Sequence, residues 1–91
     1  MYIGRVAGNV VATIKDEAFT GRKLLLVERL DLSGRESGDY DICVDVAQAG
    51  PGDQVLVLDE GNGARQILGR QEAPVRAVIV GIIDAVTIHD S

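Results

Sequence analysis

Apolar and polar residues alternate with a period of two along much of this chain, and no segment carries a sustained apolar stripe at helical spacing. Side chains of a strand point alternately to the two faces of its sheet, so this pattern is typical of strands with one buried face. Glycine and aspartate interrupt the alternation, as turns between strands require. The sequence therefore predicts an all-β fold.

The alternation predicts five strands, at residues 2–14, 23–30, 40–46, 54–58 and 78–88. A helix is the competing prediction at 23–30, because leucine, glutamate and arginine are good helix formers, but eight residues between glycine-containing loops is short for one. Pro74 can open at most one short helical turn, at 74–77. Five strands with glycine-rich corners favour a small, OB-like β-barrel formed by a single domain over residues 1–91.

Two groups of glycines have a specific structural expectation. Gly4 and Gly8 share the even positions of the first strand, so we expect them on one face, where a missing side chain permits tight coiling or close backbone approach. Gly50-Pro51-Gly52 predicts a tight turn of type II, because proline fixes φ at one corner and Gly52 can take the positive φ of the next.

The motifs that would carry chemistry are weak. Gly61-Asn62-Gly63 begins like a dinucleotide fingerprint, but Gln66 stands where the third glycine belongs and no helical pattern follows. A hairpin loop in which Asn62 and Gly63 supply positive φ is the favoured interpretation. One cysteine and one histidine cannot supply a tetrahedral zinc set, so we expect no metal and no cofactor.

The third strand carries Asp41 and Asp45 on one face, which could act as an acid–base pair. No nucleophile or histidine lies beside them in the sequence, so a solvated strand face is the simpler interpretation. Cys43 is expected to be a small packed side chain or a partner contact. No catalytic residue is predicted, and the chain is not expected to be an enzyme.

The charge balance argues against nucleic acid. Nine basic residues face fourteen acidic ones, for a net charge of −5, and only two Tyr and one Phe could stack on bases. A nucleic-acid binder needs a cationic footprint, which this balance lacks. The longest apolar tract, 75–88, is interrupted by Arg76 and Asp84 and is shorter than the ~20 residues of a membrane-spanning helix. With no leader pattern and a lone cysteine, a cytoplasmic protein without membrane contact is expected.

Three blocks of sequence together resemble one known family. They are IGRVAGNVVATIKDEAFTGRKLLLVERLD, VDVAQAGPGDQVLVLDEGNGARQ and PVRAVIVGIIDAV, which span nearly the whole chain. In order and separation they closely resemble the EutN/CcmL family of bacterial microcompartment vertex proteins. The AG-x-G-[DE] turn, the G-x-x-A-R loop and the late P-V…V-G-I-[IV]-D block make the resemblance specific in combination. Gln48 departs from the family's usual glycine, Asn62-Gly63 from its small residues and Arg76 from its common acidic residue.

The resemblance implies a structural protein that forms pentamers at the vertices of a polyhedral shell. Its partners would be other copies of itself and hexameric shell proteins, and encapsulated enzymes could also contact it. The candidates for a loop at the pentamer axis, around a narrow pore or a plug, are Gly61, Asn62 and Gly63, or Gly50, Pro51 and Gly52. The candidates for the subunit interface are Gly8, Arg65 and Asp84.

Two alternatives stay open from the sequence. A five-stranded barrel is also the frame of OB-type ligand or single-stranded nucleic-acid binding modules. A small enzyme could instead be built between subunits, if Asp45, Arg65 and Asp84 from different chains converge.

Overall fold

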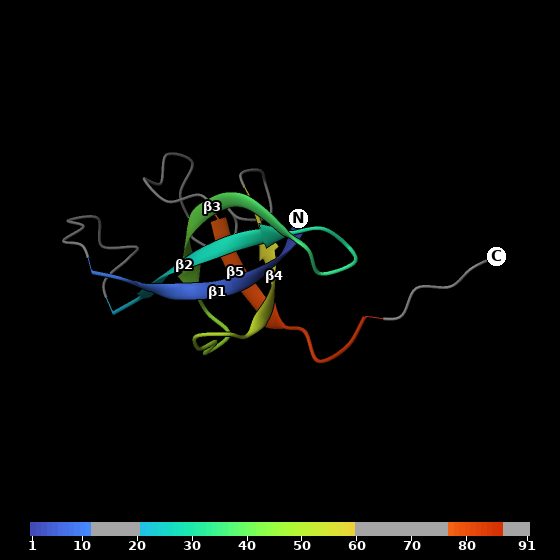
Figure 1. Cartoon of the computed structure of the whole chain (residues 1–91). Coiled ribbons are helices and arrows are strands. Elements are labelled where there is room, and N and C mark those ends of the chain that lie inside the picture. The colour runs from blue at the N-terminus through green and yellow to red at the C-terminus, as the bar shows by residue number, and fades with distance from the viewer. Residues whose placement is uncertain (12–20, 60–76, 87–91) are drawn as a thin grey trace.

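A computed structural model describes residues 1–11, 21–59 and 77–86 of the chain. Its strands are β1 (Tyr2–Val10), β2 (Lys23–Leu30), β3 (Glu36–Asp45), β4 (Gln54–Leu58) and β5 (Ala77–Ile82). They close a barrel in the order β1-β2-β3-β5-β4 (Figure 1). Neighbouring strands are antiparallel except β3 and β5, which run parallel. The predicted small all-β barrel is confirmed, and no helix occurs among the described residues. No described segment is therefore a helix long and apolar enough to span a membrane.

The predicted strand limits are partly right. β2 and β4 have the expected bounds, and the segment Lys23–Leu30 forms a strand instead of the alternative helix. β3 begins earlier than expected, at Glu36, because Glu36 already pairs with Leu30 of β2. The pairing is irregular between Glu36 and Tyr40, where Gly38 has a φ of 81°. β5 ends at Ile82, after which the next backbone amide, of Ile83, donates to the Gln54 carbonyl. The predicted helical turn and the last residues of the predicted first strand lie outside the described residues, apart from Ala77, which opens β5.

The hydrophobic core fills the inside of the barrel. Every strand contributes to it, together with one residue of the β3–β4 connection: Val6, Leu25, Val27, Cys43, Ala49, Val55, Val57, Ala77 and Ile79. Burial of a side chain such as valine or leucine stabilises a fold by roughly 1.5–3 kcal/mol, so this inner cluster is the main source of the barrel's stability.

Gly4 is a position where the barrel requires glycine. A Cβ built there would collide with the Val27 side chain and lie 2.9 Å from the Glu28 carbonyl oxygen. Because that oxygen belongs to the backbone of β2, the strand cannot move aside without disturbing the sheet. The expected close backbone approach at Gly4 is therefore confirmed.

Gly8 does not share the face of Gly4, so that prediction was wrong. Val6 pairs with Val27 and Gly8 pairs with Leu26, which leaves Ala7 as the extra residue of a β-bulge. One extra residue reverses the faces of all residues beyond it. Gly8 consequently lies on the outer face, beside Leu26, and no described atom lies within 4 Å of the point that a Cβ would occupy there.

The predicted solvated face of β3 was also wrong. Asp41 and Cys43 pair with Val27 and Leu25, both core residues, so this face of β3 lies inside the barrel. The side chain of Asp45 is only 2% exposed. Its carboxylate is tolerated because the backbone amides of Ala47 and Ala49 each donate to it over 2.9 Å.

Candidate subunit interface

The corner after β3 is held by its own hydrogen bonds. The Asp53 amide donates to the Gly50 carbonyl over 3.1 Å, and Gly52 has a φ of 85°, as expected of a type II turn. The Gly50 amide in turn donates to the Asp53 carboxylate over 2.8 Å. Val6 and this corner exchange two backbone bonds of 2.9 Å each, with Gly52 and Asp53. The corner is thus a firm extension of the β1–β4 pair.

Gln48, directly before this corner, has a φ of 60°. A side chain is unfavourable in this left-handed region, where glycine is favoured. The position is the one at which the sequence departs from the glycine usual in the family it resembles. Asp45 stabilises the strained segment by accepting hydrogen bonds from the residues on both sides of Gln48.

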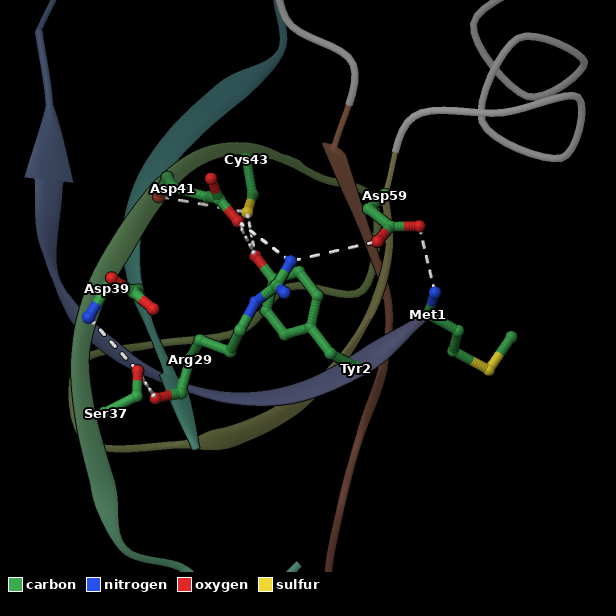
Figure 2. Close-up of polar contacts among 8 residues, drawn as sticks. All are labelled: Met1, Tyr2, Arg29, Ser37, Asp39, Asp41, Cys43 and Asp59. Carbon is green, nitrogen blue, oxygen red and sulfur yellow. Dashed lines mark hydrogen bonds and ion pairs between the residues drawn. The ribbon is translucent and has the colours of Figure 1, made fainter. Parts of the chain in front are cut away.

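A polar cluster lies at one end of the barrel (Figure 2). The Tyr2 hydroxyl donates to Asp41 Oδ2 over 2.6 Å, and the Arg29 guanidinium carbon lies 4.1 Å from the centre of the Tyr2 ring. Arg29 Nη2 lies 3.8 Å from a carboxylate oxygen of Asp41 and of Asp59. The Met1 ammonium donates to Asp59 over 2.9 Å. The cluster joins β1, β2 and β3 to the residue that follows β4.

The environment of this cluster shifts its pKa values. Burial, reinforced by the hydrogen bond to Asp41, raises the pKa of Tyr2 above its usual value. Burial raises the pKa of the Cys43 thiol to about 11. The hydrogen bond from the Met1 ammonium holds the pKa of Asp59 below its usual range. Cys43 is therefore a protonated, buried thiol at neutral pH and is not activated as a nucleophile, in line with the packed side chain expected of it.

The outer face of the sheet around β3 is apolar and is open at Tyr40 and Ile42, although Val44 on the same face is buried. The register places Gly8 of β1, Leu26 of β2 and Ile42 of β3 side by side across three strands. Ile42 is 45% exposed, and Tyr40, two residues earlier on the same face, is 52% exposed. We call Gly8, Leu26, Tyr40 and Ile42 the β3 outer patch. Tyr40 and Ile42 are about half-exposed, and Leu26 between Gly8 and Ile42 is partly buried.

A second open region lies where β1 and β4 meet. It is a cleft of about 450 Å³, which we call the β1–β4 cleft, lined by Ile3, Asp31, Leu32, Ser33, Gly34, Gln54 and Val86. Leu32 is 72% exposed and Val86 is 46% exposed. Val86 belongs to the segment 83–86, which leaves the barrel after β5 (Figure 1).

The turn that carries Leu32 is held in place by Asp31. Asp31 Oδ1 accepts hydrogen bonds from the Ser33 amide, the Ser33 hydroxyl and the Arg35 amide, over 2.9, 2.7 and 2.9 Å. The bond from Ser33 also lowers the pKa of Asp31, so the carboxylate stays charged and continues to accept. Leu32 is therefore presented at the wall of the cleft by a preorganised turn.

The sequence model of one protein family, described as "Ethanolamine utilisation protein EutN/carboxysome", matches residues 1–84. The chain belongs to the EutN/CcmL family. Among curated relatives, it is 40% identical to the carboxysome shell vertex protein CcmL of Gloeobacter violaceus, over 99% of this chain and 89% of that protein. It is also 40% identical to the bacterial microcompartment shell vertex protein GrpN of Rhodospirillum rubrum, over 94% of this chain and 96% of that protein.

Solved structures of EutN/CcmL proteins share the fold. The pentameric microcompartment shell protein GrpN of R. rubrum matches with a TM-score of 0.83 and 39% identity, covering 98% of this chain and 100% of its own. CcmL of G. violaceus matches with a TM-score of 0.82 and 40% identity, covering 97% and 90%. These relatives are named as shell proteins. The comparisons therefore do not support the nucleic-acid-binding alternative, and they agree with the expected non-enzymatic role.

The predicted site residues of this EutN/CcmL chain are only partly described. Gly8 lies in the β3 outer patch, and Asp84 is exposed in the segment after β5. Asp45 is buried and engaged within its own chain, which removes one member of the proposed interface enzyme. Arg65 and the Gly61-Asn62-Gly63 corner lie outside the described residues, so their roles stay predictions.

Sequence reasoning missed the exposed side chains of the two open regions. Tyr40 and Ile42 were recognised as a strand face but not as its outer one. Leu32 carried a readable signal, since it is the one apolar residue in the polar stretch DLSGRESGD. A single exposed leucine is ordinary, but Leu32 and Val86 are exposed together around one cleft, and grouped apolar side chains of this kind mark a contact with another molecule.

Proposed function

We propose that this chain is a structural protein of a bacterial microcompartment shell and forms pentamers at the vertices of that shell. The observation that carries the proposal is the match to pentameric GrpN, which extends over 98% of this chain and all of that one. Similarity over nearly the whole length leaves no separate segment in GrpN to account for its assembly. The relatives named above as shell vertex proteins support the same role.

The distribution of apolar side chains supports assembly. The inner face of the barrel is filled by the core cluster, yet large apolar side chains stay exposed on the outer face and around the cleft. Removing apolar surface from water is favourable by roughly 25 cal/mol per Å², so a ring that covers these side chains gains stability. For a small domain with a thin core, that gain is a substantial part of the total.

The ring has a geometric purpose in a shell. A flat sheet of hexagonal tiles cannot close on itself, and pentagons supply the missing curvature. Hexameric shell proteins would then surround each pentamer, and encapsulated enzymes would lie on its inner side. The axis of the ring would be lined by one of the two glycine-rich corners, since five copies of a large side chain cannot converge there.

One of the two glycine-rich corners would lie nearer the axis than the other. We favour Gly61-Asn62-Gly63, because Asn62 can present a neutral amide to water around a narrow polar pore. Gly50-Pro51-Gly52 is the competing corner, and its backbone bonds to Val6 would give the axis a rigid lining.

Shell closure tests the function. Hexameric shell protein should be produced with and without this chain, and the particles compared by electron microscopy. We expect closed polyhedra with the chain, with a gold label on it at the vertices, and open sheets or tubes without it. Equal closure in both preparations, or label spread over the facets, would contradict the vertex role.

A further inference from the structure

We infer that the subunits join head to tail, with the β3 outer patch of one copy seated in the β1–β4 cleft of the next. This arrangement depends on the proposed pentamer, in which these two surfaces form each contact. The occupant of the cleft is a second copy of this chain.

Ring symmetry requires two unlike surfaces. In a two-fold dimer both subunits use the same patch, whereas a ring of five repeats a heterologous contact in which one surface meets a different one. Each subunit must therefore expose a pair of complementary regions on different sides. A chain with only one exposed apolar region would not satisfy this requirement.

The strands that contribute to the two regions are separated in the barrel. Following the strand order, β3 is two strands away from β1 in one direction and two strands away from β4 in the other. The cleft includes Ile3 of β1 and Gln54 of β4, which belong to the paired region of these two strands. The β1–β4 junction thus lies across the closed barrel from β3, and the turn between β2 and β3 completes the cleft with Asp31, Leu32, Ser33 and Gly34.

The two regions are complementary in shape and chemistry. The patch presents two large side chains, Tyr40 and Ile42, next to Gly8, where no described atom lies within 4 Å of the Cβ position. The cleft is concave, with apolar walls from Leu32 and Val86. Tyrosine is a frequent interface anchor because its ring is apolar and its hydroxyl can find a polar partner. The Gln54 amide in the lining of the cleft is such a partner.

Two charge insertions test the pairing. Ile42→Glu should disable only the patch and Leu32→Glu only the cleft, and both side chains are exposed enough for the barrel to tolerate the change. Each variant alone should be a monomer by native mass spectrometry, because every contact would contain one disabled surface. An equimolar mixture, with one variant labelled with ¹⁵N, should give a dimer containing one copy of each. Val11→Glu, which puts the same charge on an exposed valine outside both regions, should stay a ring.

A cross-link tests the contact without weakening the ring. A chain with both Ile42→Cys and Leu32→Cys should form, on oxidation, a covalent ladder that ends at five copies. Either substitution alone should give no covalent species, and buried Cys43 should not contribute.

The outcomes separate the inference from the proposed function. A pentameric wild type whose two glutamate variants stay pentameric would overturn the head-to-tail assignment and leave the vertex role standing, as would disulfide-linked dimers of Ile42→Cys alone. The same conclusion follows if the variants stay pentameric but no longer join hexameric shell protein, because the cleft would then hold a hexamer. A monomeric wild type would overturn both.

Discussion

The two faces of β3 have opposite relations to the rest of the molecule. The face with Asp41, Cys43 and Asp45 lies inside the barrel, whereas the other face is open at Tyr40 and Ile42 and closed at Val44. An antiparallel sheet that is solvated on one side normally shows the reverse, with apolar residues inward. At Asp41 and Asp45 the inner face of β3 uses polar contacts to connect parts of the chain, and in the proposed ring the outer face at Tyr40 and Ile42 meets another copy.

The inner face tolerates its polar groups because each of them has a partner. Among the described residues, no buried side-chain nitrogen or oxygen lacks a hydrogen bond. Lys23 Nζ adds to this network, 3.6 Å from Asp45 and 2.8 Å from the Ala49 carbonyl oxygen. The contrast between the faces can be tested in two ways. One removes a hydrogen-bonding group from the inner face, and the other adds a side chain to the inner or the outer face.

The largest expected effect follows from removing the buried carboxylate. Asp45→Ala leaves the Ala47 and Ala49 amides without their acceptor. An unsatisfied buried group costs roughly 1–3 kcal/mol, so the free energy of unfolding should fall by about 2–4 kcal/mol. Urea denaturation of wild type and variant measures it, with exposed Asp39→Ala as the control. A loss below about 0.5 kcal/mol would show that the carboxylate does not hold the loop.

The two glycines of β1 provide a matched comparison of the faces. Gly4→Val should destabilise the barrel by about 1–3 kcal/mol or more, because its side chain would overlap Val27 and the β2 backbone. Gly8→Val should leave the subunit's folding intact and weaken only the ring. Thermal unfolding and particle mass, measured on both variants, separate the effects. Equal losses of subunit stability would show that the bulge does not divide the faces.

Alkaline pH should affect the inner face through Tyr2. Its pKa is raised in the folded state from the usual 10.0, so its contribution is complete below pH 10 and decreases as pH rises further. A fully buried group would change stability by about 1.4 kcal/mol per pH unit. An unfolded tyrosine is half-ionised at pH 10, so the full effect between pH 10 and 11 would be about 1 kcal/mol. Because Tyr2 is only half-buried and solvent screens it, wild type should lose roughly 0.5 kcal/mol more than Tyr2→Phe over this interval. Parallel pH profiles for the two proteins would contradict the buried hydrogen bond.

The smallest expected effect is a gain. Gln48→Gly should stabilise the chain by about 1 kcal/mol, because glycine adopts the left-handed conformation without the penalty that glutamine incurs. Ala47→Gly, at a neighbouring position, should stabilise nothing and serves as the control. An unchanged or lower melting temperature for Gln48→Gly would indicate that glutamine makes a compensating contact.

Much of the fold was predictable from local pattern. Alternation identified Lys23–Leu30 and Gln54–Leu58 as strands, and proline between glycines identified the turn at Gly50–Gly52. These features depend on residues close in sequence, where backbone preference and side-chain alternation act directly. The close approach at Gly4 was also predicted, because a glycine within a strand often marks a position where another backbone comes near.

The faces were harder to predict because they depend on distant partners. The bulge at Ala7 exists only in the pairing of β1 with β2, and no residue type in β1 predicts its position. The alternation at β3 separates Tyr40 from Asp41 but does not say which face closes around the core. That choice depends on Tyr2 and on the Ala47 and Ala49 amides, which supply the partners that make inward carboxylates acceptable.

In the proposed ring of five, the exposed part of β3 contacts another subunit. Native mass spectrometry of the untagged wild-type chain at low micromolar concentration tests this most directly. We expect one dominant species with five times the 9.7 kDa mass of the chain. A monomer or a dimer as the dominant species at that concentration would contradict the ring.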